Sequence, residues 1–308
     1  MKRENPILIA EIGATNARLD ILQGRQSRAK QDNYLLEEFN SIESLLRDYL
    51  NKTGIVTERA IIGVAAPILG DEVQFINNNL KFSQRELKKN IFKEELLVLN
   101  DLELQAHAIR SLRKEDILVI GNKKKPLRGS KILVSPGTGL GLAGVIEGNV
   151  MSTEAGHLHV PANLSGFSFI VERFEAENNR MPTFEDFLSG QGLNTIYRFL
   201  SDHHSCSYSN EEILSEKKDI DCLRTKKLTT HLLSVFLRYM TLIWGASGGV
   251  YLSGSIANSL MQDINAKEFR KNFEDSHKMK MFLTNTPLFL VLDLNLGLRG
   301  AREIASNS

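Results

Sequence analysis

LLVLNDL, residues 96–102, joins a short apolar run to the start of a helical pattern. The apolar residues 96–99 are typical of a buried strand. Helical spacing follows at Leu102, Gln105, Ala106 and Ile109. This spacing predicts a helix that packs through those positions, so Asn100 and Asp101 fall where a strand ends and a helix begins.

The Asn100-Asp101 pair has two interpretations. Ligands of open α/β sheets collect at the carboxyl ends of strands, and a carboxylate there can take a proton from a bound hydroxyl. Asn and Asp are also favoured helix N-caps, and a cap is the simpler interpretation of the pair by itself. Motifs elsewhere in the chain are therefore needed to decide between them.

The composition is that of a globular protein long enough for two domains. The chain has 308 residues, of which 42% are hydrophobic and 24% charged, and its net charge is +1. We therefore expect no nucleic-acid partner and no membrane surface, and no apolar run approaches the length of a membrane span. Cys206 and Cys222 lack metal-ligand spacing, which favours reduced thiols and a cytoplasmic location.

A first hairpin is predicted near the N-terminus. Residues 7–12 are typical of a strand, residues 13–16 (GATN) of a tight turn, and residues 17–22 of the returning strand. The backbone N–H groups of such a turn, with the hydroxyl of Thr15, form a concavity that binds anions. An ordinary hairpin is the alternative.

A second hairpin repeats this pattern. Residues 131–134 lead into SPGTGLG, residues 135–141, and residues 142–146 form the returning strand with Thr138 at the tip of the turn. Two such hairpins predict a duplicated domain in which each copy offers N–H groups to one phosphate chain. The repeat therefore indicates a nucleotide ligand.

Polar residues follow the second hairpin in STEAGHLH, residues 152–159. Glu154 and His157 are suited to accept from and donate to sugar hydroxyls. A metal pair of His157 and His159 is disfavoured because no third ligand has a suitable spacing. Further along, TFEDFLSG, residues 183–190, predicts a short helix ended by glycine.

Six motifs in this chain occur in the order in which a known family carries them, and they cover nearly its whole length. The family's segments read roughly DxGGTNARL, ND, GTGLG, EGGH and ExxLSG, followed by an adenosine segment. They match residues 11–19, 100–101, 137–141, 154–157, 185–190 and 248–256. The chain therefore resembles bacterial glucokinases of the sugar-kinase and actin superfamily.

The resemblance implies an α/β architecture, namely a two-domain actin-like ATPase (ribonuclease H-like) fold with a cleft between a small and a large domain. The small domain is expected at residues 1–106 plus 296–308, and the large domain at residues 107–295. A homodimer is also implied. The cysteine-rich zinc motif of the related repressor-type sugar kinases is absent from the sequence.

The resemblance also implies the activity, an ATP-dependent glucokinase that phosphorylates the 6-hydroxyl of glucose at the entry to glycolysis. Asp101 is then the general base, and Asn100, Glu154, His157 and Glu185 hold the other hydroxyls. Mg²⁺ is expected with ATP, and Glu11 is expected to contact it through water. The nucleotide is expected at Ala10, Glu11, Ile12, Gly13, Ala14, Thr15, Gly137, Thr138, Gly139 and Gly254.

Several positions depart from the family's pattern. Glu11 stands where the family has aspartate, which moves the carboxylate outward by roughly 1.5 Å. Ala14, Ala155 and Ser255 replace glycines, and Pro136 removes a backbone N–H donor. Because Ala14 departs beside Glu11, we expect the first turn to have adjusted as a unit. Two alternatives stay open: a sugar-binding or regulatory protein with weak turnover, and a kinase of another hexose.

Overall fold

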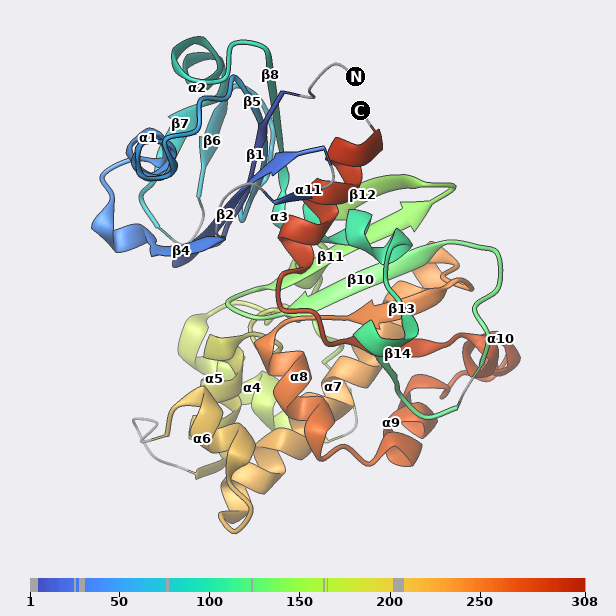
Figure 1. Ribbon diagram of the computed structural model, residues 1–308. Helices are drawn as coiled ribbons and strands as arrows, with labels where there is room; N and C mark the ends of the chain where they lie inside the picture. The colour runs from blue at the N-terminus through green and yellow to red at the C-terminus, as the bar shows by residue number, and fades with distance from the viewer. Residues whose placement is uncertain are drawn as a thin grey trace. The chain divides into compact units, whose positions relative to one another are not determined.

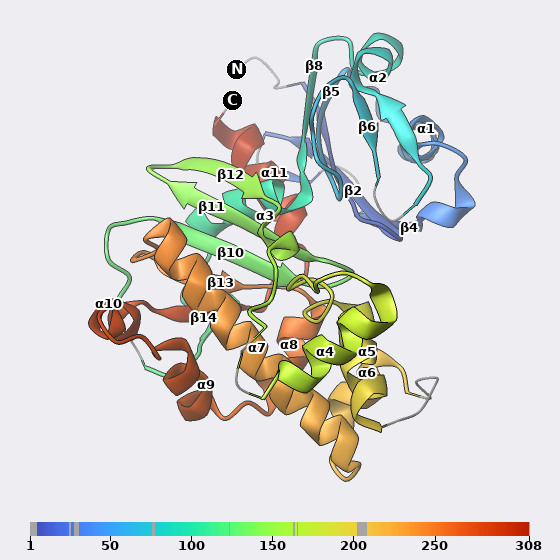
Figure 2. The same ribbon diagram turned by 180° about the vertical axis from the view of Figure 1, so that it is seen from behind.

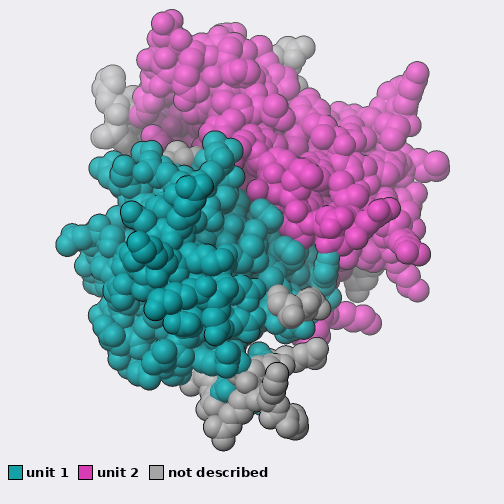
Figure 3. Space-filling model, turned by 90° about the horizontal axis from the view of Figure 1, so that it is seen from above, with its two compact units in different colours: residues 1–112, 294–308 teal, residues 113–293 magenta. Residues whose placement is uncertain are grey.

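The computed structural model describes residues 5–24, 26–27, 31–75, 78–122, 124–162, 164, 166–201 and 208–307. The chain forms two compact units, unit 1 (residues 1–112 and 294–308) and unit 2 (residues 113–293), shown in teal and magenta in Figure 3. The sequence-based boundaries were 106 and 296. Unit 1 also takes in residues 107–112, where the Ser111 hydroxyl accepts from the Arg299 guanidinium of the returning segment at 3.0 Å.

Unit 1 is built on a mixed sheet in the order β3-β2-β1-β5-β8, with β4 also paired to β2. Strand β1 is antiparallel to β2 and parallel to β5, which is parallel to β8. A small hairpin, β6-β7, lies apart from this sheet. The strands are β1 (Ile7–Ile12), β2 (Asn16–Gln23), β3 (Gln26–Ser27), β4 (Asp32–Leu35), β5 (Arg59–Val64), β6 (Glu72–Gln74), β7 (Lys81–Ser83) and β8 (Glu95–Asn100).

Helices cover both faces of the unit 1 sheet (Figures 1 and 2). On one face α1 (Ile42–Thr53) and α2 (Gln84–Asn90) pack with Leu8, Ala10 and Ile62. On the other, α3 (Asp101–His107) and α11 (Leu296–Asn307) pack with Ile7 and Ile9. The 3-10 turns η1 (Leu36–Glu38) and η2 (Ala108–Arg110) follow β4 and α3. The C-terminal helix is therefore part of the core that surrounds β1.

Unit 2 repeats the arrangement of the first sheet. Its order is β12-β11-β10-β13-β14-β9. Strand β10 is antiparallel to β11 and parallel to β13, which is parallel to β14. The predicted hairpins at both glycine turns are thus confirmed, in β1-β2 and β10-β11. The strands are β9 (Ile117–Val119), β10 (Lys131–Pro136), β11 (Leu140–Ile146), β12 (Asn149–Thr153), β13 (Gly249–Leu252) and β14 (Leu288–Val291).

The core of unit 2 lies between its sheet and a group of helices. Figure 2 shows the long helix α7 lying across the sheet, and its Phe236 and Leu237 are fully buried in the cluster that contains Ile132 and Val134 of β10. Cys222 of α7 is buried in the same cluster, whereas Cys206 lies outside the described residues. The helices are η3 (Lys114–Asp116), η4 (Ala155–His157), α4 (Ser168–Asn178), α5 (Gly190–Ser201), α6 (Asn210–Ser215), α7 (Ile220–Trp244), α8 (Ser255–Gln262), α9 (Ala266–Phe273) and α10 (Lys280–Asn285).

One local prediction was wrong. Residues 183–190 do not form a short helix ended by Gly190 but a looped segment, and Gly190 is the first residue of α5. The segment instead pairs with residues 156–160: the Phe184 N–H donates to the Leu158 carbonyl at 2.9 Å.

No helix in the described part of the chain is long and apolar enough to cross a membrane.

Candidate functional site

The first glycine turn follows β1 directly. The Gly13 N–H donates to the Asn16 carbonyl at 2.8 Å, which closes the turn. The Asn78 side chain donates to the Ala14 carbonyl at 2.9 Å, and Thr15 is exposed at the tip. The turn therefore has a fixed backbone and presents a hydroxyl to its surroundings.

Glu11 is held in unit 1 just before this turn. Its side chain is almost fully buried, with 9% of its surface exposed. The Gln105 amide of α3 donates to Oε1 at 2.8 Å, and the Arg18 guanidinium of β2 donates to Oε2 at 3.2 Å. A Cβ at Gly297 of α11 would overlap the Glu11 carboxyl carbon. Helix α11 therefore packs directly against the Glu11 carboxylate, and only glycine at position 297 leaves room for this contact.

These contacts decide how the site fits Mg²⁺. The described residues hold no group of three or more His, Cys, Asp or Glu side chains that could cage a metal ion. One carboxylate beside a glycine turn would suit Mg²⁺ that keeps most of its waters. Since each carboxylate oxygen accepts more than one hydrogen bond, Glu11 can contact such a water while Gln105 and Arg18 stay in place.

Asn100 caps helix α3, as the simpler interpretation of the dipeptide predicted. Its side-chain oxygen accepts from the Leu102 N–H at 2.9 Å and the Glu103 N–H at 3.3 Å, and its amide donates to the Ala66 carbonyl at 3.3 Å. Asp101 is the first helical residue, and its Oδ1 accepts from the Leu102 N–H at 3.0 Å. The cap thus fixes the backbone from which the Asp101 side chain projects.

The second glycine turn connects β10 and β11 in unit 2. The Gly137 N–H donates to the Gly139 carbonyl at 2.8 Å, and the Gly137 carbonyl accepts from the Gly190 N–H at 2.8 Å. Thr138 is exposed at the tip. Gly254 lies close by, since a Cβ there would be 2.7 Å from the Pro136 carbonyl oxygen. The structure therefore brings these four predicted nucleotide residues together.

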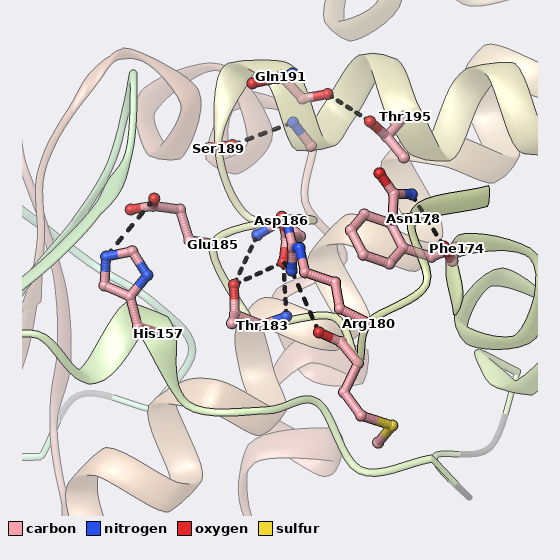
Figure 4. A network of polar contacts seen from close by, with 12 residues as sticks. His157, Phe174, Asn178, Arg180, Thr183, Glu185, Asp186, Ser189, Gln191 and Thr195 are labelled. Carbon is pink, nitrogen blue, oxygen red and sulfur yellow. Dashed lines mark hydrogen bonds and ion pairs between the residues drawn. The ribbon is translucent and has the colours of Figure 1, made fainter. Parts of the chain in front are cut away.

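The predicted sugar residues of unit 2 also lie together. The His157 Nε2 atom is 4.0 Å from Glu154 Oε2 and 3.9 Å from Glu185 Oε1. Figure 4 shows the His157 and Glu185 side chains pointing toward each other. Half or more of the His157 and Glu154 surfaces is exposed, but only 33% of the Glu185 side chain. Two carboxylates and an imidazole thus form a small, accessible group of acceptors and a donor.

The loop that carries Glu185 is fixed by its neighbour Asp186 (Figure 4). Asp186 accepts two hydrogen bonds from Arg180, at 2.7 and 2.6 Å, and two from Thr183, both at 2.8 Å. Burial raises the pKa of Asp186, but the hydrogen bonds from Arg180 and Thr183 outweigh it and bring the pKa below its ordinary value. Asp186 is therefore a charged anchor for the loop.

Three supporting residues were missed at the sequence level. Gln105 was assigned to the packing face of its helix, but its amide binds Glu11. It stands four residues after Asp101, and this spacing places both on one face of α3. Gly297 lies outside the six motifs, and Leu140 lies in the GTGLG segment but was given no role, because the roles of both depend on residues distant in sequence.

Comparisons with known proteins agree over nearly the whole chain. The family model described as glucokinase matches residues 8–308. The glucokinase of Salmonella typhi is 32% identical over 308 residues, covering 96% of this chain and 95% of that protein. The crystal structure of a glucokinase from an Antarctic psychrotroph is 25% identical with a TM-score of 0.83, covering 99% of both chains.

More distant structures share the fold. A Balamuthia mandrillaris glucokinase, solved in complex with glucose, is 20% identical with a TM-score of 0.79, covering 98% of this chain and 93% of that one. An ROK hexokinase from Thermus thermophilus is 15% identical with a TM-score of 0.66, covering 97% of each chain. The predicted actin-like ATPase fold is therefore confirmed.

We expect Asp186→Asn to lower the melting temperature by about 2–4 °C, because the amide cannot accept all four hydrogen bonds. The depressed pKa of Asp186 means that its stabilisation is present above the ordinary carboxyl pKa of about 3.9 and is lost as the pH falls through the lower, folded-state value. Thermal melts at pH 7 and below pH 4 should therefore show a difference from the parent that shrinks in acid.

Asp263→Asn is the matched control for this variant. Asp263 makes one exposed ion pair, with Lys217 at 3.5 Å, and such pairs contribute little to stability. Equal melting temperatures for the two variants at pH 7 would contradict the role given to Asp186.

Proposed function

The chain belongs to the glucokinase family, and we propose that it transfers the γ-phosphate of ATP to the 6-hydroxyl of glucose, giving glucose 6-phosphate and ADP. The observation that supports glucose most directly is the group of Glu154, His157 and Glu185 beside the second glycine turn. A sugar needs several fixed donors and acceptors, because each buried polar group left unpaired costs about 1–3 kcal/mol.

Each unit contributes a different part of the proposed chemistry. In unit 2, Glu154 and Glu185 accept hydrogen bonds from sugar hydroxyls, and His157 donates or accepts. In unit 1, Asn100 binds a sugar hydroxyl through the side-chain amide that also donates to the Ala66 carbonyl. Asp101 takes the proton of the 6-hydroxyl while the hydroxyl oxygen attacks the γ-phosphate. Phosphoryl transfer depends on such positioning and on charge stabilisation more than on covalent chemistry.

ATP is proposed to bind through both glycine turns. The first supplies Gly13, Ala14 and Thr15, with Ala10, Glu11 and Ile12 of β1 beneath them, and the second supplies Gly137, Thr138 and Gly139, with Gly254. Each turn is closed by a backbone hydrogen bond and presents an exposed threonine hydroxyl, which is a donor for a phosphate oxygen. Mg²⁺, when bound, neutralises phosphate charge, and Glu11 is the residue proposed to contact it through water.

Three further expectations remain predictions. They are the place of the reaction at the entry to glycolysis, a cytoplasmic location and a homodimeric assembly. The place in glycolysis and the homodimer rest on the resemblance to the family, and the cytoplasmic location rests on two cysteines without metal-ligand spacing. Size-exclusion chromatography with light scattering would measure the assembly directly.

The proposed activity is tested by an assay that couples ADP formation to NADH oxidation, with Mg·ATP and with glucose, mannose or an N-acetylhexosamine as the sugar. We expect glucose to be the preferred substrate. Asp101→Asn should keep its affinity for glucose but reduce kcat by roughly 10²–10⁴-fold, because the amide cannot take the proton. The matched control is Glu103→Gln, the next carboxylate on α3, which should turn over like the parent.

No glucose-dependent ATP turnover in the parent would overturn the proposed function. Normal kcat in Asp101→Asn would leave the activity in place and remove Asp101 as the base.

We expect Glu11→Asp to lower kcat by roughly tenfold with little change in glucose affinity. The shorter aspartate side chain would no longer reach Gln105 and would leave a gap beside Gly297. Because the Glu11 charge is proposed to stabilise the transition state, its displacement should lower kcat. Steady-state kinetics at saturating Mg·ATP, with glucose affinity by calorimetry, measures both quantities. Glu11→Gln keeps the length of the side chain and removes its charge, so it separates the two effects. A higher kcat in Glu11→Asp would instead indicate that the parent is a kinase with weak turnover.

A further inference from the structure

Three segments of unit 2 meet at Leu140, where the second glycine turn enters β11. They are the turn itself (residues 137–141), the segment around η4 (residues 154–157) and the loop at residues 183–190. Backbone hydrogen bonds tie the loop to both other segments: the Glu185 N–H donates to the Gly156 carbonyl at 2.9 Å, and the Gly190 N–H donates to the Gly137 carbonyl at 2.8 Å. The proposed sugar and phosphate residues thus share one piece of backbone scaffold.

The Glu185 carboxylate divides its two oxygens between these segments. Oε2 accepts from the Leu140 N–H of the turn at 2.7 Å. Oε1 lies 3.9 Å from His157 Nε2, on the side where the sugar residues gather. One side chain therefore contacts the turn with one oxygen and faces the sugar group with the other.

Two glycines make this arrangement possible. A Cβ at Gly139 would lie 2.6 Å from Glu185 Oε2, so the carboxylate occupies the place that a side chain would take. A Cβ at Gly156 would overlap the Leu140 carbonyl oxygen, so η4 also packs directly on the turn. Of the two, only Gly139 faces a movable side chain, because Gly156 faces backbone.

We propose that Glu185 couples hexose binding to the conformation of the second glycine turn, so that sugar and nucleotide bind cooperatively. Held by Leu140, the carboxylate is already oriented for a sugar hydroxyl at Oε1. A sugar bound there restricts Glu185 and so fixes the turn for a phosphate. Glu185 is then a positioning residue for the turn as well as a sugar ligand. This inference rests on the proposed function.

The first test changes the turn and measures sugar binding. Gly139→Ala places a methyl group against Glu185 Oε2, and the flexible carboxylate has to move. We expect glucose affinity, measured by calorimetry without nucleotide, to fall about tenfold, the loss of one hydrogen bond to a charged group. Gly137→Ala is the matched control: a Cβ there has no atom within 4 Å, so glucose affinity should stay at the parent's value.

The second test is the reciprocal one. Glu185→Ala should lower the affinity for AMP-PNP, measured without sugar, by about three- to tenfold, because the Leu140 N–H loses its acceptor. Glu154→Ala removes a sugar carboxylate that makes no such contact with the turn, and it should leave the AMP-PNP affinity unchanged. Parent-like melting temperatures in all variants show that the affinity changes are local.

The outcomes separate this inference from the proposed function. A parent that does not bind glucose overturns the proposed function. A parent that binds and phosphorylates glucose, with parent-like glucose affinity in Gly139→Ala and parent-like AMP-PNP affinity in Glu185→Ala, overturns the coupling alone. Equal losses of glucose affinity in Gly139→Ala and Gly137→Ala also contradict it, because a general disturbance of the turn then explains both.

Discussion

Strand β1 is buried on both faces of its sheet. The C-terminal helix α11 covers one of these faces, so residues 294–308 belong to the same unit as β1. Ile7 and Ile9 face the cluster with α3 and α11, whereas Leu8 and Ala10 face the cluster with α1. Burying an isoleucine or leucine side chain contributes about 1.5–3 kcal/mol, so a sheet without α11 would leave a costly apolar face in water. The first glycine turn continues directly from this buried strand.

The parts of the fold that local chemistry determines could be predicted. The two hairpins follow from glycine turns between alternating strands, and Asn100 caps α3 as its position between a strand and a helical pattern indicates. The loop at residues 183–190 could not. Its helical pattern is overridden by pairing with residues 156–160, and Gly190 finds its partner in Gly137, far away in the sequence.

The candidate site shows the same division. Motifs identify the residues that carry chemistry, because reactions demand particular side chains at particular spacings. The partners that hold those side chains are set by tertiary contacts, and nothing in the residue type marks them. Gln105 fits a packing face by spacing, yet it binds Glu11. Leu140 acts through its backbone N–H, which every residue except proline has, so its identity carries no information about the contact with Glu185.

Glu11 carries one methylene more than the aspartate of the family's pattern, and helices pack around the extra length. Gly297 of α11 leaves the space that the carboxyl carbon fills, and Gln105 of α3 reaches its oxygen. The register of β1 with β2 continues through Ile12, opposite Ala17, and the turn closes normally at Gly13. The Ala14 carbonyl accepts a separate hydrogen bond from the Asn78 side chain. The longer acid therefore makes its contacts with α3 and α11, beside a turn that closes between Gly13 and Asn16. Aspartate at position 11 would leave the space beside Gly297 unfilled. A substitution at position 11 therefore has to be interpreted together with the residue at position 297.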